Sequence, residues 1–390
     1  MSGWQIIFLA LALGLLVAPL LRLAGQKITG DAPYWRDMPY GAAYGFVLAA
    51  LALAGAVWLY LINGNVFFRW AVQGFIVFAI AAFVFRLAGR TVGTAWTRRQ
   101  FRKMPLTAAF GILMILIYAF VAIFAQWLAP YGQEEILSKA NLVPGGDPAL
   151  GGDPGFPLGT DQIGRDILSR LIYGAQNTVG IAFATTCLAF LLGGTMGFLA
   201  ATLGGWLDQL LSRIVDVLMA IPALIFALLL MTIASAWAGS ERGLLTLYMV
   251  IIIAVIDSTR VFRLSRAVGA NIVVMDYIEA AKLRGEGLGY LVFREILPNA
   301  MAPLLAEFGL RFCFVFLTIA SLSFLGVGIQ PPLADWGTMV RDLSQFINYA
   351  AFVPLAASVP LLAAGAIALL TVAVNFVVDW MLHRSSGLKE

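Results

Sequence analysis

The chain has 390 residues, of which 61% are hydrophobic and only 12% are charged. Soluble domains carry about 25% charged residues, so this chain has too little polar surface to cover a core in water. The composition argues against a soluble enzyme, a secreted scaffold and a disordered protein. It predicts an all-α integral membrane protein.

The formal net charge of +4 would suggest nucleic acid in a soluble protein. Here the 25 Lys and Arg residues are spread over an apolar chain and are better explained as signals of membrane topology, so no nucleic-acid partner is expected. Two cysteines, Cys187 and Cys313, lie in apolar stretches, and the single histidine, His383, is near the C-terminus. These residues predict neither a disulfide framework nor a metal site.

Apolar stretches long enough to cross a bilayer recur along the whole chain, since a spanning helix needs about 20 such residues. No basic residue precedes the first stretch, which is the reverse of the charge order in a signal peptide, so we expect an uncleaved span there. The nine predicted spans are Trp4–Leu21, Gly41–Leu61, Trp70–Phe85, Pro105–Leu128, Thr178–Leu203, Ile214–Ala236, Leu244–Phe262, Ala300–Leu322 and Phe352–Met381.

The basic segment from Arg86 to Lys103 sets the predicted orientation, because Lys and Arg are retained on the cytoplasmic side of a membrane. It holds six cations and no acid: Arg86, Arg90, Arg98, Arg99, Arg102 and Lys103. Alternation then places the N-terminus and the long 129–177 connection outside. The segment after Phe262 and the C-terminal tail fall inside.

A composition break near Thr91–Lys103 divides the chain into two predicted parts. Residues 1–103 form an extension with three predicted spans and a basic linker, and residues 104–390 hold the other six. Peripheral packing, stabilisation of a partner and lipid contact are all compatible with the extension.

The polar segment after the seventh span, residues 276–298, is too polar to cross the bilayer and too patterned to be a simple turn. Ile278, Ala281 and Leu288 offer an apolar stripe, and Gly285 interrupts the helical pattern. This pattern predicts a short helix across the cytosolic face, ended by glycine, with an exposed side for a partner.

Four segments of the chain resemble one family. Glu279-Ala280-Ala281, Gly285 and Leu297-Pro298 fall at the spacing of the EAA motif of importer-type ATP-binding cassette (ABC) permeases. Glu295 stands where the general pattern has Ile, and Ile296 resembles the variant of the dipeptide, oligopeptide and nickel permeases. The other three are Leu158–Gly174, Asp208 to Asp216 with Pro222, and Ser323–Gly337, in the order that the family has.

Over roughly residues 105 to 380 the chain is therefore similar to the second, C-type permease subunit of the peptide and nickel subfamily. This resemblance implies a six-helix type I ABC importer permease core, here with about three extra N-terminal helices, in a bacterial cytoplasmic (inner) membrane. It implies a heterodimer with a homologous permease, two ABC ATPase subunits and an extracytoplasmic solute-binding protein.

The resemblance also implies that ATP and Mg²⁺ bind to the ATPase partners, so that this chain carries no cofactor and is not an enzyme. The sequence has no phosphate-binding loop motif, and Gly285, Gly287 and Gly289 lack the strand–turn–helix setting of a nucleotide site. The implied ATPase-coupling residues are Glu279, Ala280, Ala281, Gly285, Leu297 and Pro298. A purely loop-shaping role for them is the alternative.

Ionisable residues within membrane spans are costly and merit attention. They are Asp216, Asp257, Arg260, Glu307, Arg311 and Asp379. Asp257 with Arg260, and Glu307 with Arg311, stand one helical turn apart and are predicted to pair. Glu307 and Arg311 are also candidates for lining a translocation path.

Two other classes of protein compete with this interpretation. A membrane-embedded enzyme needs a nucleophile–base or metal constellation, which one terminal histidine and scattered carboxylates do not supply. In an ion-driven secondary transporter, the cytosolic segment around Glu279 would have no functional role. No residue pattern chooses the cargo among peptides, nickel and related small solutes.

Overall fold

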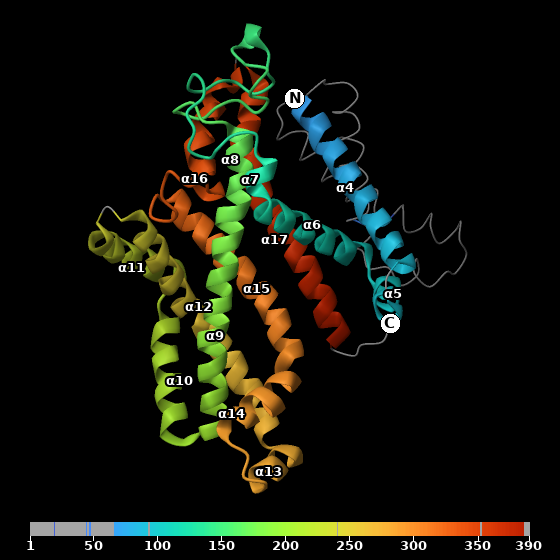
Figure 1. Cartoon of the computed structure of the whole chain (residues 1–390), viewed down its shortest axis with the longest axis vertical. Coiled ribbons are helices and arrows are strands. Elements are labelled where there is room, and N and C mark those ends of the chain that lie inside the picture. The colour runs from blue at the N-terminus through green and yellow to red at the C-terminus, as the bar shows by residue number, and fades with distance from the viewer. Residues whose placement is uncertain are drawn as a thin grey trace. The chain divides into compact units, whose positions relative to one another are not determined.

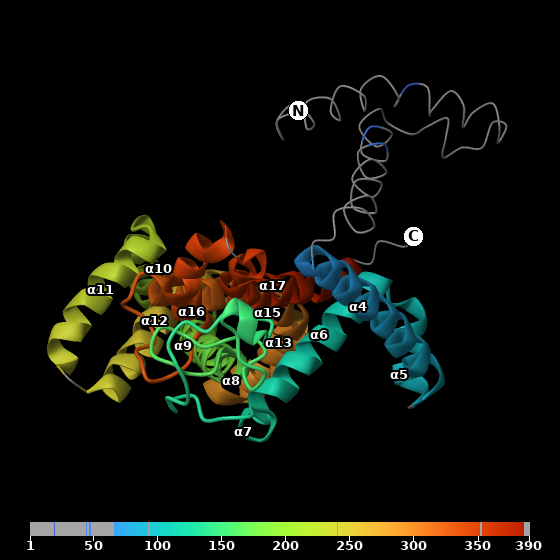
Figure 2. The same cartoon turned by 90° about the horizontal axis from the view of Figure 1, so that it is seen from above.

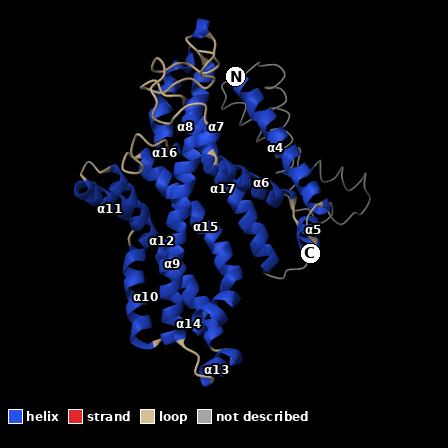
Figure 3. Ribbon diagram, viewed as in Figure 1, coloured by secondary structure: helices blue, strands red, loops and turns tan. Residues whose placement is uncertain are grey.

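The computed structural model describes residues 66–385 apart from Gly93, Ser240 and Phe352, together with the isolated residues Pro19, Tyr44 and Val47. The predicted spans Trp4–Leu21 and Gly41–Leu61 lie outside the described residues. The chain forms two compact units, Met1–Val77 and Phe78–Glu390. Within the described part the regular structure is helical (Figure 3), with one isolated β-bridge between Thr160 and Asp166.

The helices follow one another along the chain with short connections, except for the long stretch of residues 129–166 between α7 and α8 (Figure 1). The predicted connection of residues 129–177 thus ends in helical residues, and the name 129–177 loop is kept below for this stretch together with α8 and the start of η2. The α-helices are α4 (Val66–Thr91), α5 (Ala95–Lys103), α6 (Leu106–Ile123), α7 (Ala125–Leu128), α8 (Ile167–Gly174), α9 (Gly180–Leu203), α10 (Gly205–Ala220), α11 (Ala223–Ala238), α12 (Arg242–Val273), α13 (Asp276–Leu283), α14 (Leu288–Tyr290), α15 (Leu297–Phe324), α16 (Trp336–Leu343) and α17 (Ser358–Ser385). Shorter 3₁₀ or π turns are η1 (Pro148–Leu150), η2 (Ala175–Val179), η3 (Leu291–Ile296), η4 (Ser344–Ala351) and η5 (Pro354–Ala357).

In the described residues, 6 helical segments are long and apolar enough to cross a membrane, and a bent helix pair adds a seventh. Five of the six segments and the bent pair follow residue 104, which confirms the predicted all-α membrane architecture with its six-helix core. The segments are Val72–Thr91, Leu106–Ile123, Ile167–Leu203, Arg242–Val273, Leu288–Phe324 and Leu355–Arg384.

The predicted straight span Ile214–Ala236 is wrong, because the chain bends by 91° between α10 and α11. Pro222 causes the break. Its ring disfavours helical geometry at the preceding residue, and Ile221 accordingly has the extended angles φ −90° and ψ 131°. Residues 214–236 are largely apolar on both sides of Pro222, with Asp216 as their only charged residue, so apolar length alone did not reveal the bend.

The longest helices pack closely because glycines let their backbones approach each other. A methyl group at Gly193 of α9 would lie 2.3 Å from the carbonyl oxygen of Ser258 in α12, and one at Gly197 would lie 2.7 Å from the carbonyl oxygen of Phe262. Figure 2 shows α9 near the centre, with α10 and α11 on one side and α6 on the other. The polar segment of residues 276–298 and the 129–177 loop occupy opposite ends of this packed bundle (Figure 1).

We predict that Gly193→Val destabilises the bundle by about 1–3 kcal/mol, the usual cost of forcing extra methyl groups into a packed core. Thermal denaturation of the purified protein in detergent measures the effect. Gly180 is the matched control, because a side chain at this first position of α9 meets no atom within 4 Å. Equal midpoints for Gly193→Val and Gly180→Val would show that the glycine contact does not hold α9 to α12.

Candidate functional site

The polar segment of residues 276–298 begins with α13, a short helix whose end is fixed by glycine. The backbone N–H of Gly285 donates to the carbonyl of Lys282 at 2.9 Å, and that of Glu286 donates to the carbonyl of Ala281 at 3.2 Å. These two bonds form a Schellman motif, which needs a left-handed residue at the glycine position. Gly285 has φ +83°, so the sequence-predicted glycine stop is confirmed.

One face of α13 is buried against the bundle. Ile278 and Ala281 are each 0% exposed. They share one apolar cluster with Ile272 at the end of α12 and with Ile296 and Ala300 at the start of α15. The helix α13 is therefore packed onto both long helices that it connects.

The opposite face of α13 is open. Glu279, Ala280 and Lys282 are exposed, and Leu283 at the end of the helix is 83% exposed. Asp276 and Glu279 lie in the first turn and Lys282 lies in the last turn, which is the charge order that the helix dipole favours. The EAA residues thus divide into a buried Ala281 and an exposed pair, Glu279 and Ala280.

A continuous helical run carries the segment into the membrane span. α14, η3 and α15 follow without a break over Leu288–Phe324, and η3 is a π-type turn directly before Leu297. Pro298 stands at the start of α15. Because its ring clashes with the carbonyl four residues earlier, the wider π turn gives the ring room within an unbroken helix.

A charged triad lies between α12 and α15, with Asp257 and Arg311 buried and Glu307 partly exposed. An Arg311 guanidinium nitrogen is 2.7 Å from a Glu307 carboxylate oxygen, and another is 3.7 Å from an Asp257 carboxylate oxygen. Arg311 is 6% exposed and sits 4.5 Å from the centre of the Phe314 ring. The predicted pairing of Glu307 with Arg311 is confirmed.

The predicted pairing of Asp257 with Arg260 is wrong. Asp257 pairs across to α15 instead, and the guanidinium of Arg260 lies 5.7 Å from the Phe314 ring. Helical spacing places Arg260 one turn from Asp257 and therefore predicted it as the partner. The actual partner, Arg311, is on α15 and comes close only because α15 packs against α12. Asp379 is exposed on α17.

Two ion pairs tie α10 to α12. A carboxylate oxygen of Asp216 lies 2.6 Å from an Arg263 nitrogen, and Asp208 accepts two hydrogen bonds from Arg266, one of them at 2.6 Å. Asp208 was part of a sequence motif, but its partner was missed, because ion pairs between helices are not visible in sequence spacing. α10 is thereby fastened to the half of α12 that leads into α13.

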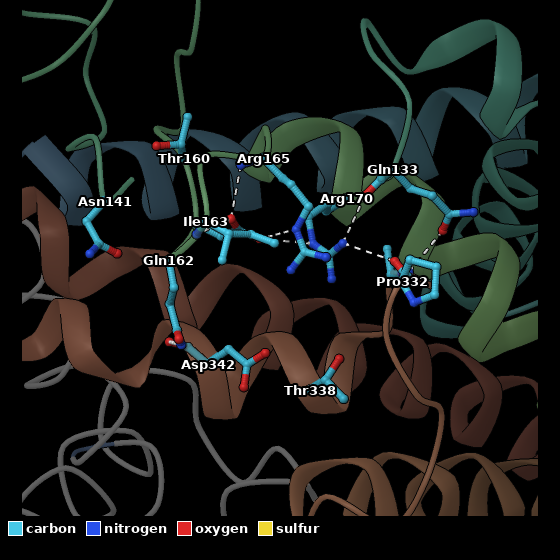
Figure 4. Close-up of polar contacts among 12 residues, drawn as sticks. Gln133, Asn141, Thr160, Gln162, Ile163, Arg165, Arg170, Pro332, Thr338 and Asp342 are labelled. Atoms are coloured by element: carbon cyan, nitrogen blue, oxygen red, sulfur yellow. Dashed lines mark hydrogen bonds and ion pairs between the residues drawn. The ribbon is translucent and has the colours of Figure 1, made fainter. Parts of the chain in front are cut away.

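At the other end of the bundle, two motifs far apart in sequence meet in one polar cluster (Figure 4). Arg170 donates to the carbonyls of Gln133 at 2.9 Å and Pro332 at 3.4 Å, and it lies 3.5 Å from a carboxylate oxygen of Asp161. The side-chain oxygen of Gln133 in turn accepts from Asn177 and from the backbone of Ala334. The 129–177 loop and the 325–335 loop are therefore one connected structure.

Trp336 and Asp335 extend this connection into the core. The indole N–H of Trp336 donates to the carbonyl of Leu171 at 2.9 Å, and Thr178 donates to the carboxylate of Asp335 at 2.9 Å. Asp335 also caps α16 by accepting from the backbone N–H of Thr338. Burial raises the pKa of the Asp335 carboxyl above its usual value, while these hydrogen bonds favour the charged form.

Family models match most of the chain after the basic segment. Residues 193–386 match the model described as binding-protein-dependent transport system inner membrane component. Residues 94–144 match the model of the N-terminal TM domain of oligopeptide transport permease C. The match thus begins close to the predicted boundary between the extension and the core.

Curated relatives agree with these models. The chain is 35% identical to the dipeptide transport system permease protein DppC of Haemophilus influenzae, over 64% of this chain and 81% of that protein. It is 36% identical to the di/tripeptide transport system permease protein DppC of Pseudomonas aeruginosa, over 62% of this chain and 76% of that protein. It is 31% identical to the glutathione transport system permease protein GsiD of Pectobacterium atrosepticum, over 65% of this chain and 80% of that protein.

The resemblance drawn from the four sequence motifs is therefore confirmed. The helical bundle, the family models and the relatives agree. This chain belongs to the family of binding-protein-dependent transport system inner membrane components, as a multi-pass, C-type permease subunit of an ABC peptide importer.

Proposed function

We propose that the chain pairs with a homologous permease and that the two together form the translocation path. The complex also contains two ABC ATPase subunits, which bind ATP and Mg²⁺, and an extracytoplasmic solute-binding protein. The relatives named for dipeptide, di/tripeptide and glutathione transport support a peptide or a related small solute as the cargo. This chain has no catalytic role in the proposal.

The division of α13 into a buried and an open face carries the coupling proposal. Ile278 and Ala281 fix the helix to the bundle, so a force applied to its open face reaches α12 and α15. Glu279, Ala280 and Leu283 form the surface offered to an ATPase, Gly285 makes the turn, and Leu297 with Pro298 begin the span that moves. Closure of the ATPases would then displace the packed helices as a rigid body.

The proposed orientation places α13 and the C-terminus in the cytoplasm and the 129–177 loop outside. The basic segment of residues 86–103 supports this assignment, because α6 runs from that segment to the loop (Figure 1). The N-terminus is then outside. In this arrangement residues 1–103 form the extension and residues 104–390 form the permease core. The extension takes no part in a transport step.

Glu307 and Arg311 are proposed to line the path. The Glu307 side chain keeps 21% of its surface exposed although it pairs with a buried arginine. A partly exposed carboxylate in a membrane span is expensive beside lipid, so water or the partner permease is the neighbour that this position fits. Asp257 holds Arg311 from the other side and is a positioning residue.

We predict that Gly285→Val lowers the ATPase stimulation that cargo-loaded binding protein gives to the assembled complex. A β-branched residue at φ +83° costs about 1–2 kcal/mol, and the loss of the Schellman turn would release the end of α13. Space is not the cause, because no atom lies within 4 Å of a side chain at this position. ATP hydrolysis by reconstituted complexes measures the effect.

The matched control is Gly287→Val, since Gly287 also has open space around it but has φ −75°. This variant should keep normal stimulation. Stimulation that is equally strong in Gly285→Val and in Gly287→Val would count against any role of the turn in coupling. Basal ATP hydrolysis and subunit assembly are recorded in both variants, so that loss of the complex is recognised.

A second prediction concerns the path. In a chain with Cys187 and Cys313 replaced by alanine, Glu307→Cys should react with a charged, membrane-impermeant thiol reagent, and transported cargo should slow the reaction several-fold. Ala306→Cys is the control, because the neighbouring Ala306 is 3% exposed and should stay unlabelled. Equal labelling of both positions, or no effect of cargo, would remove Glu307 from the path.

A further inference from the structure

α5 is a basic amphipathic helix with its cations on one side. Thr97 and Phe101 on one side are partly buried, and Met104 directly after the helix is 2% exposed. The opposite side carries Arg98, Arg99, Arg102 and Lys103, all of which are exposed. These four residues with Arg86 and Arg90 at the end of α4 are called the basic collar below.

The collar is held on an ordered scaffold. The Phe101 ring packs edge-on against Phe85 at 5.3 Å between ring centres. It also occupies the space that a side chain at Gly89 would take, since a methyl group there would lie 2.3 Å from the ring. Thr94 caps the start of α5 by accepting from the backbone N–H of Thr97. The cations therefore project from a docked helix and not from a loose linker.

The collar has no counter-charge of its own. No Asp or Glu occurs in the sequence between Asp37 and Glu134. Among the described residues, none of the six collar cations lies within 4.0 Å of a carboxylate. The Nε atom of Arg86 is also buried without a hydrogen-bond partner in the described part, and an unmet buried donor is unfavourable. The described residues therefore supply no anionic acceptors for the collar cations. A separate anionic molecule is needed to supply them.

The position of the collar points to the bilayer surface. α5 leads directly into the membrane span α6, and the collar lies where that span begins and where the span α17 ends (Figure 1). Trp380 of α17 packs in the same apolar cluster as Phe85 and Phe101. The guanidinium of Arg384 lies 5.9 Å from the Trp380 ring. Aromatic rings with neighbouring cations are typical of the headgroup layer.

We propose that the basic collar is a binding site for anionic phospholipids, with the lipid phosphate groups held between α5 and the end of α4. Clusters of four to eight cations on an amphipathic helix beside a membrane span attract such headgroups, and guanidinium forks suit phosphate oxygens. The headgroup layer of the bilayer lies at the ends of the membrane spans. The phosphate groups are therefore already next to the collar and need not bind from solution. The inference concerns the lipid surface and does not depend on which ATPase or cargo the transporter uses.

The test compares lipid retention by the purified complex after reconstitution in phosphatidylcholine mixed with phosphatidylglycerol. Native mass spectrometry counts the bound lipids of each kind. Arg98→Gln with Arg102→Gln should lower the preference for phosphatidylglycerol about fivefold for each neutralised cation, which corresponds to about 1 kcal/mol per charge at 1.4 kcal/mol per tenfold change. Arg98→Lys with Arg102→Lys should keep most of the preference, because the charge is retained.

Two controls make the result specific. Lys139→Gln with Arg213→Gln also removes two exposed cations, but from the 129–177 loop and α10, and should leave the lipid preference unchanged. Soluble glycerol phosphate should not displace the retained lipid, because it lacks the acyl chains that place the headgroup at the collar.

Three outcomes would overturn the proposal. Equal phosphatidylglycerol retention in the collar variant and the wild type would show that the cations do not bind lipid. Displacement by soluble glycerol phosphate would assign the site to a free phosphate compound. Loss of the ATPase subunits from the collar variant with unchanged lipid retention would assign the surface to an acidic protein partner. Thermal denaturation of every variant confirms that the compared complexes are folded.

Discussion

The contacts between α12 and α15 are the constraint on which the rest of the larger unit depends. At the coupling end, Ile278 of α13 is buried in a cluster shared by both helices. In the middle, Arg311 of α15 faces Asp257 of α12. At the far end, Arg242 of α12 donates to the carbonyl of Pro331. Because packed interiors transmit displacement, these three contacts connect α12 both to α15 and to the loop that follows α15.

The far end of this body is also the place where the two loop motifs meet. Arg170 and Gln133 connect the 129–177 loop to the segment before Trp336. Trp336 then anchors that segment on the carbonyl of Leu171. Motifs that are separated by more than a hundred residues in the sequence therefore form one cap over the bundle. A displacement that starts at α13 has an uninterrupted route of contacts to this cap.

Local chemistry explains which features the sequence predicted. The turn at Gly285 depends on residues within one helical turn, and the membrane spans depend on apolar length, so both could be predicted. The partner of Asp257 depends on how two distant helices pack, and helical spacing supplied Arg260 instead of Arg311. The bend at Pro222 was missed because residues 214–236 are largely apolar on both sides of it, although the proline itself was visible in the sequence. The six collar cations were expected as a topology signal, but the docking of Phe101 into the space beside Gly89 exists only in the folded chain.

The bend at Pro222 separates two parts of the chain that are held in different ways. On one side, Arg263 and Arg266 fasten α10 to α12 through Asp216 and Asp208. On the other side, α11 leaves at 91°. The Asp216 pair is about half exposed, so each such ion pair contributes only about 0–1 kcal/mol, far less than the glycine-mediated contact of α9 with α12. The close approach of α9 to α12 at Gly193 and Gly197 therefore holds these helices more strongly than the exposed ion pairs hold α10 to α12.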